Sequence, residues 1–196
     1  MSNRKILLIQ AHPDEGSLCQ ALADAFEAGA ASGNAELRRI NLRELQFDPI
    51  LHQGYRGQQA LEPDLLAAQE SLAWADHLVF VYPNWWGSMP ALLKGFFDRT
   101  LLPGFAFKFR PNSSLWDKLL SGRTAQILVT MDTPGWYYRW VWHRPGHTQM
   151  RHTILGYCGI KLKRISEFAP VHGAGVAKRE RWLQQARELG QRCVQG

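Results

Sequence analysis

The sequence has little of what membrane-spanning or disulfide-linked proteins need. Its 196 residues include only Cys19, Cys158 and Cys193, an odd number without CxxC or CxxH spacing, which argues against a disulfide framework or a thiolate zinc site. The longest apolar runs, such as residues 6–9 and 78–82, are far shorter than the roughly 20 residues of a membrane-spanning helix. The run near the N-terminus is also too short for a secretory signal. We therefore expect a cytoplasmic protein without membrane insertion.

The two halves of the chain differ in their balance of charge, and acidic residues are scarce in the second half. Residues 1–100 carry 8 basic and 12 acidic side chains, whereas residues 101–196 carry 15 basic and 5 acidic ones. The basic residues are scattered rather than run together, which favours a small anionic ligand such as a nucleotide phosphate over a nucleic acid. An ordinary solvated basic surface also remains open. Apolar residues make up 45% of the sequence, enough for the core of one domain spanning residues 1–196.

Aliphatic runs and helical periodicity alternate along the whole chain. The predicted strands are 4–10, 36–42, 77–82, 123–130 and 161–168, and the predicted helices are 17–29, 64–75, 90–102 and 176–194. Residues 46–61 are rich in turn formers, and residues 131–146 form the longest stretch predicted to be irregular. This alternation predicts a doubly wound α/β fold, with a five-stranded parallel sheet and helices on both faces.

Three loops follow predicted strands at their carboxyl ends, where open parallel sheets bind ligands. The first, residues 10–17, combines His12 with the Ser17 hydroxyl and the free amides of a helix N-terminus, which suits an anionic phosphate. It has neither the GxGxxG nor the GxxxxGK[ST] pattern, which argues against a Rossmann dinucleotide site and an NTPase P-loop. Ser17 can also serve simply as a helix cap.

The other two loops are rich in aromatic and titratable residues. Residues 83–90 (PNWWGSMP) place two adjacent indoles between prolines, and such flat apolar surface suits a planar heteroaromatic ring. The third loop supplies candidates for polar contacts and proton transfer, each of which can also be an ordinary surface or packing residue. These candidates are Asp132, Thr133, Tyr137, Tyr138, His143 and His147.

Three segments, taken in order, carry a resemblance to a known family. They are His12-x4-Ser17, residues 82–99 (YPNWWGSMPALLKGFFDR) and residues 155–160 (LGYCGI), and the middle one is the most specific. Together they resemble the NAD(P)H:quinone oxidoreductases with a flavodoxin-like fold, relatives of DT-diaphorase. The chain looks like a compact, bacterial-type member without the C-terminal extension of the animal enzymes.

The resemblance implies a flavin, FAD or FMN, with NAD(P)H as co-substrate and ping-pong transfer to a quinone or similar acceptor. It also implies a homodimer. By the same resemblance the first loop would hold the flavin phosphates, and the second would line the ring. The implied cofactor-binding residues are His12, Ser17, Leu18, Cys19, Pro83, Asn84, Trp85, Trp86, Gly87, Thr130, Asp132 and Thr133.

Residues that assist proton transfer are harder to place from the resemblance. Tyr138 and His143 are the nearest matches to a Tyr and a His that assist catalysis in the diaphorases. The family's Thr-Thr-Gly-Gly turn after the fourth strand is replaced here by residues 130–135 (TMDTPG). The role of Asp132 in this turn is therefore open.

Two other functions remain as alternatives. Residues 11–15 (AHPDE) resemble the AHPDD loop of zinc-dependent N-acetyl-sugar deacetylases, although Glu15 replaces an expected Asp, and His143 and His147 do not form the partner motif. The resemblance to the quinone oxidoreductases, in contrast, implies no metal site. The second alternative is a flavin-carrying regulatory subunit of a membrane transporter, with which a basic C-terminal half is compatible.

Overall fold

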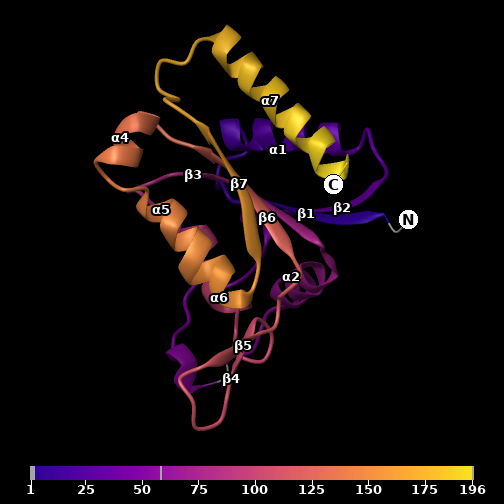
Figure 1. Ribbon diagram of the computed structural model, residues 1–196, viewed down its shortest axis with the longest axis vertical. Coiled ribbons are helices and arrows are strands. Elements are labelled where there is room, and N and C mark those ends of the chain that lie inside the picture. The colour runs from indigo at the N-terminus through magenta and orange to yellow at the C-terminus, as the bar shows by residue number, and fades with distance from the viewer. Residues whose placement is uncertain (1–2, 58, 196) are drawn as a thin grey trace.

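A five-stranded parallel sheet forms the centre of the molecule, in the order β2-β1-β3-β6-β7 (Figure 1). The computed structural model describes residues 3–57 and 59–195. The strands of this sheet are β1 (Arg4–Gln10), β2 (Ala35–Asn41), β3 (His77–Pro83), β6 (Thr124–Thr130) and β7 (Lys161–Phe168). All neighbouring strands pair in parallel, so their carboxyl ends meet at one edge of the sheet.

Helices cover both faces of the sheet, because its central strands are apolar on both sides. Alternate residues of β1 divide between two cores, with Leu7 and Ile9 in one and Ile6 and Leu8 in the other. The first core packs against α2 (Pro63–Trp74), α3 (Ala91–Thr100) and the helical segment 145–158. The second packs against α1 (Leu18–Ala30) and α7 (Val176–Gln195), which lie side by side in Figure 1. The predicted doubly wound α/β fold is confirmed.

The region predicted to be irregular contains helices. Helix α4 (Gly135–Trp140) lies within it, and α5 (Pro145–Thr148), the π-helical η3 (Gln149–Leu155) and α6 (Gly156–Cys158) follow as one helical segment. The prediction of a loop over 131–146 was therefore partly wrong. Pro134 precedes α4 directly and Pro145 begins α5, and proline at a helix start is readily mistaken for a helix breaker.

Several short elements lie outside the central sheet. The sequence did not predict the antiparallel pair of β4 (Phe107–Phe109) and β5 (Trp116–Lys118), because strands of three residues give little periodicity. Two 3₁₀ turns precede α2: η1 (Leu42–Glu44) follows β2 directly, and η2 (Gly54–Arg56) lies within the turn-rich stretch 46–61. Within the described residues, no helix is both long and apolar enough to cross a membrane.

Candidate functional site

The three predicted loops meet at the carboxyl edge of the sheet and enclose a cleft of about 220 Å³. The cleft brings together nine of the twelve residues predicted to bind a cofactor. They are His12, Ser17, Leu18, Cys19, Pro83, Asn84, Trp85, Thr130 and Asp132. Asp14, Met131 and Val171 also line it and were not predicted. Val171 lies in the loop after β7. The sequence could have indicated it only through the position of that loop, because the fifth predicted strand ends at the same carboxyl edge of the sheet.

Helix α1 presents its N-terminus to this cleft. Ser17 caps the helix, because its hydroxyl accepts a hydrogen bond from the Gln20 amide at 3.2 Å. The first amides of a helix have no acceptor within the helix, and this cap leaves those of Leu18 and Cys19 available. The positive end of the helix dipole adds to the attraction for an anion.

His12 is held as a hydrogen-bond donor beside that helix end. Its Nδ1 accepts the backbone N–H of Asp14 at 3.0 Å, so the neutral ring carries its proton on Nε2. Burial is the main cause that lowers the pKa of His12 below its ordinary value, and it outweighs the raising effect of Asp14. The ring also contacts Trp85 edge to face, with centroids 5.4 Å apart, which joins the first loop to the second.

The second loop is a tight turn with two left-handed residues. Trp85 and Ser88 exchange backbone hydrogen bonds of 2.9 and 3.0 Å, while Trp86 and Gly87 have φ of +52° and +76°. A bulky residue in this conformation costs on the order of 1–3 kcal/mol, and such strain is concentrated at functional sites. The turn leaves the Trp86 indole wholly exposed and outside the cleft lining.

The third loop is fastened to the second through the carbonyl oxygen of Gly87. That oxygen accepts the Gly146 amide at 2.9 Å and the Tyr138 hydroxyl at 3.0 Å. A Cβ at Gly146 would lie 2.7 Å from the same oxygen, so the close approach requires glycine. Tyr138 is 1% exposed and its hydroxyl is engaged in this junction. The Tyr138 hydroxyl therefore joins the second and third loops, and its part in proton transfer stays a prediction.

The other predicted residues of the third loop lie apart from the cleft or act on its walls. His143 lines a different pocket, and neither His143 nor Tyr138 is among the residues that line the cleft. Thr133 is half-buried and also outside the cleft lining. The Asp132 carboxylate accepts the His172 amide at 2.6 Å, which fixes the loop after β7 against the cleft.

The thiol of Cys19 is buried in the lining of the cleft. Its sulfur lies 3.3 Å from the Thr130 hydroxyl, and burial raises the pKa of Cys19 to about 12. Cys158 and Cys193 are likewise free and buried. The cleft therefore offers hydroxyl, amide and imidazole donors rather than a reactive thiolate.

The described residues give no support to a zinc hydrolase. Within 3–57 and 59–195, no group of three or more His, Cys, Asp or Glu side chains could hold a metal ion. The Asp14 carboxylate instead accepts the Gly16 amide at 3.1 Å, and Glu15 extends outward to Arg43 at 3.4 Å.

Comparison with known proteins agrees with this geometry. A family described as having a flavodoxin-like fold matches residues 4–192. The chain is 27% identical over 191 residues to the ribosyldihydronicotinamide dehydrogenase (quinone) of Rattus norvegicus, an alignment covering 83% of this chain and 80% of the rat protein. The chain therefore belongs to the flavodoxin-like family of NAD(P)H:quinone oxidoreductases, as its sequence motifs predict.

Solved structures show the same fold. The NAD(P)H:quinone oxidoreductase of Methanothermobacter marburgensis superposes with a TM-score of 0.81 at 23% identity, over 98% of each chain. The FMN-dependent NADH-azoreductase of Bacillus anthracis str. Ames Ancestor, solved in complex with FMN, gives a TM-score of 0.72 at 19% identity, over 97% of this chain and 99% of the azoreductase.

The junction at Gly87 predicts the effect of a small substitution. We expect Gly146→Ala to lower the free energy of unfolding by about 1–3 kcal/mol, because the added methyl group forces the two loops apart. Gly175→Ala is the matched control, since a Cβ there has no atom within 4 Å. Urea unfolding followed by circular dichroism measures both. Equal stability of the two variants would contradict the described junction.

Proposed function

We propose that the protein is a flavin-dependent NAD(P)H:quinone oxidoreductase. The observation that carries the proposal is the convergence of the α1 amides, the His12 ring N–H and the Thr130 hydroxyl on one cleft at the carboxyl edge of a flavodoxin-like sheet. The name of the Methanothermobacter marburgensis protein supports the same activity, and the name of the rat protein supports a quinone acceptor, with ribosyldihydronicotinamide as its donor.

The residues present suit the phosphate that FMN and FAD share. The amides of Leu18 and Cys19 would bind phosphate oxygens, with the Nε2–H of His12 as a further donor. The phosphates of either flavin fit this donor set. FAD and FMN are therefore to be distinguished by identifying the chromophore released from the purified protein. The azoreductase bound to FMN is the neighbour that favours FMN.

The chain itself would orient the reactants, since the hydride chemistry belongs to the flavin. The backbone of residues 83–87 would line the ring edge, where the N–H groups of Trp86 and Gly87 are not used within the turn. Trp86 would add a flat apolar surface, because its indole is fully exposed in the same turn as Trp85, which lines the cleft. NAD(P)H and the quinone would then bind in turn at the same place, as in ping-pong exchange.

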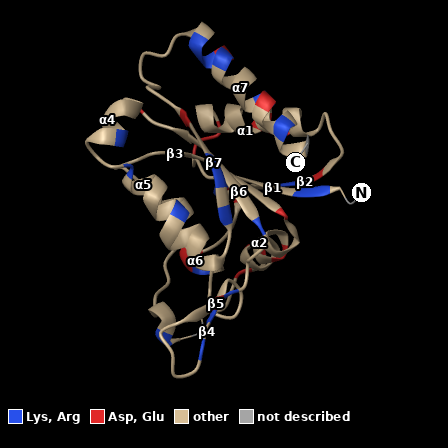
Figure 2. Cartoon of the chain, in the orientation of Figure 1, with Lys and Arg blue, Asp and Glu red and all other residues tan. Residues whose placement is uncertain are grey.

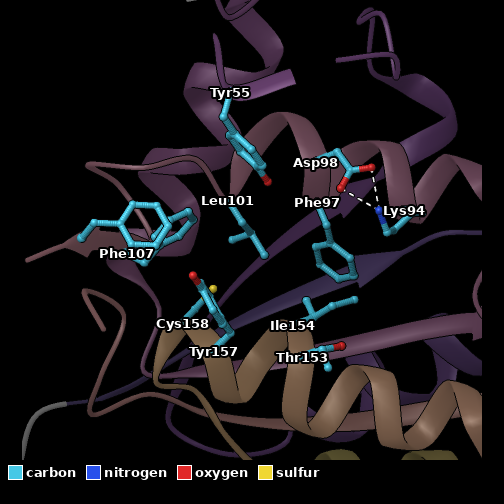
Figure 3. A pocket seen from close by; sticks show the side chains of 11 residues that line it. Tyr55, Lys94, Phe97, Asp98, Leu101, Phe107, Thr153, Ile154, Tyr157 and Cys158 are labelled. Atoms are coloured by element: carbon cyan, nitrogen blue, oxygen red, sulfur yellow. Dashed lines mark hydrogen bonds and ion pairs between the residues drawn. The ribbon is translucent and has the colours of Figure 1, made fainter. Parts of the chain in front are cut away.

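A homodimer in the cytoplasm belongs to the same proposal. An apolar groove of about 290 Å³ lies between α3 and the helical segment 145–158 (Figure 3). Phe97 comes from α3, Leu101 directly follows that helix, Tyr157 comes from the facing helical segment and Phe107 from β4. The Lys94–Asp98 ion pair of 2.7 Å lies at one side of the groove. Apolar surface rimmed by charge suits a second copy of the chain.

Turnover tests the proposal directly. Protein loaded with flavin is expected to oxidise NADPH or NADH in the presence of a soluble benzoquinone, with parallel double-reciprocal plots. Flavin-loaded protein that reduces no quinone with either nucleotide would contradict the proposed activity.

Replacing Trp86 separates its role from general packing. Trp86→Ala is expected to weaken flavin binding by about tenfold, because loss of an aromatic contact costs on the order of 1 kcal/mol or more. Trp140→Ala removes another exposed indole, on α4 outside the cleft, and is expected to change nothing. Fluorescence titration with flavin measures both affinities. Unchanged affinity in the Trp86 variant would rule out the stacking role.

The lowered pKa of His12 predicts that cofactor binding depends on pH. Burial lowers the pKa of His12 in the free protein, whereas a bound phosphate raises it, so binding takes up protons. FAD affinity is therefore expected to rise as pH falls through the pKa of the bound state, and to level off below that of the free state. FAD is the better probe, because its pyrophosphate does not titrate there. His12→Gln should flatten the profile, and a profile identical to wild type would contradict the contact.

A further inference from the structure

A second pocket, of about 310 Å³, lies between the helical segment 145–158 and the edge strand β7. It shares no lining residue with the cleft at α1. Arg144, Arg151, Lys163 and Arg164 line it, together with a single carboxylate, Glu167. Figure 2 shows Lys and Arg on β7 and on the helical segment beside it. This is where part of the excess positive charge of the C-terminal half gathers.

Most of these cations lack a carboxylate partner. The carboxylate of Glu167, the one acidic side chain in the pocket, lies 3.6 Å from the Nε of Arg144 and pairs with that residue. Within the described part of the chain, Arg151, Lys163 and Arg164 have no carboxylate within 4.0 Å. Four cations gathered in a concave site with a single carboxylate attract an anion.

A buried histidine in the same pocket has unused hydrogen-bonding groups. His147 is 6% exposed, and neither ring nitrogen has a hydrogen-bond partner among the described residues. Its Nε2 lies 3.8 Å from the Glu167 carboxylate, beyond hydrogen-bond distance. Burial, helped by Arg144 and Arg151, lowers the pKa of His147 to about 4, so the ring is neutral at pH 7. A neutral ring can donate one hydrogen bond to a ligand oxygen, and burial without such a partner costs free energy.

The backbone around the pocket departs from regular geometry in two places. The pairing of β7 with β6 shifts register next to Lys163, and both Lys163 and Arg164 line the pocket although successive strand residues normally point to opposite faces. His143 and Arg144 both have left-handed backbone, with φ of +55° and +52°. Bulges and strained residues of this kind occur preferentially beside functional sites.

We propose that this pocket binds the phosphate group of a small phosphorylated ligand. Several cations with a neutral imidazole donor match the charge and the many oxygens of a phosphomonoester better than those of one carboxylate. The volume exceeds that of a phosphate ion, so the phosphate belongs to a larger molecule. Either the 2′-phosphate of NADPH or a separate phosphorylated metabolite supplies this chemistry. The phosphate site stands independently of the flavin, because the two sites share no lining residue, whereas NADPH as its ligand rests on the proposed function.

A matched pair of double variants tests the site in the full-length protein saturated with flavin. Lys163→Gln with Arg164→Gln removes two cations of the pocket. Lys178→Gln with Arg179→Gln is the control, because it removes a consecutive Lys-Arg pair in α7 that does not line the pocket. The probes are inorganic phosphate and 2′-AMP. Calorimetry measures their binding, and the NMR signal of the His147 ring reports whether they bind in this pocket.

Wild type and the α7 control are expected to bind both probes, with a shift of the His147 signal. The pocket variant should bind them at least about tenfold more weakly. Equal binding by the two variants, or no shift of His147, overturns the site. Failure to bind flavin would overturn the proposed function alone, because the His147 signal reports this pocket in either case.

The source of the phosphate follows from kinetics with the same variants. If the pocket holds the 2′-phosphate of NADPH, the pocket variant raises KM for NADPH by about tenfold and leaves KM for NADH unchanged. If both KM values stay at wild type while binding of the probes is lost, the ligand is a separate phosphorylated molecule. Both results retain the phosphate site and assign its source.

Discussion

The carbonyl oxygen of Gly87 is the point on which the geometry of the site depends. It accepts two hydrogen bonds from the third loop, and the turn that carries it holds Trp86 in a strained, exposed conformation. The Asn84 amide ties the base of this turn to Thr130 at the end of β6 at 2.7 Å. Loops from β3 and β6 therefore form one wall, against which the α1 terminus closes the cleft.

Some polar groups of the loops are free to bind a ligand, whereas others hold the loops in place. Donors that remain free lie at the cleft, on α1 and His12, whereas polar groups that are fully used, such as the Tyr138 hydroxyl and the Asp132 carboxylate, hold loops in place. The pocket at β7 differs from the cleft because its donors are mainly cationic side chains rather than backbone amides. The cleft at the carboxyl ends of the strands and the pocket along the edge strand β7 are thus two surfaces suited to phosphate by different chemistry.

The sequence predicted the sheet well, because β1, β3 and β6 are continuous apolar strands whose ends are marked by polar loops. It also predicted most of the cleft, since those loops follow the strands directly. It failed where long-range contacts decide the conformation. The helix over 145–158 depends on packing of its apolar residues against the core, and the burial of Tyr138 depends on a contact with Gly87, 51 residues away. Neither contact leaves a local pattern.

The visible absorption spectrum of the purified protein, recorded before and after anaerobic addition of NADPH, tests the central claim most directly. The account predicts a two-band flavin spectrum that bleaches on reduction, with the released chromophore identified against FMN and FAD standards. A colourless protein that takes up neither flavin on reconstitution would contradict it.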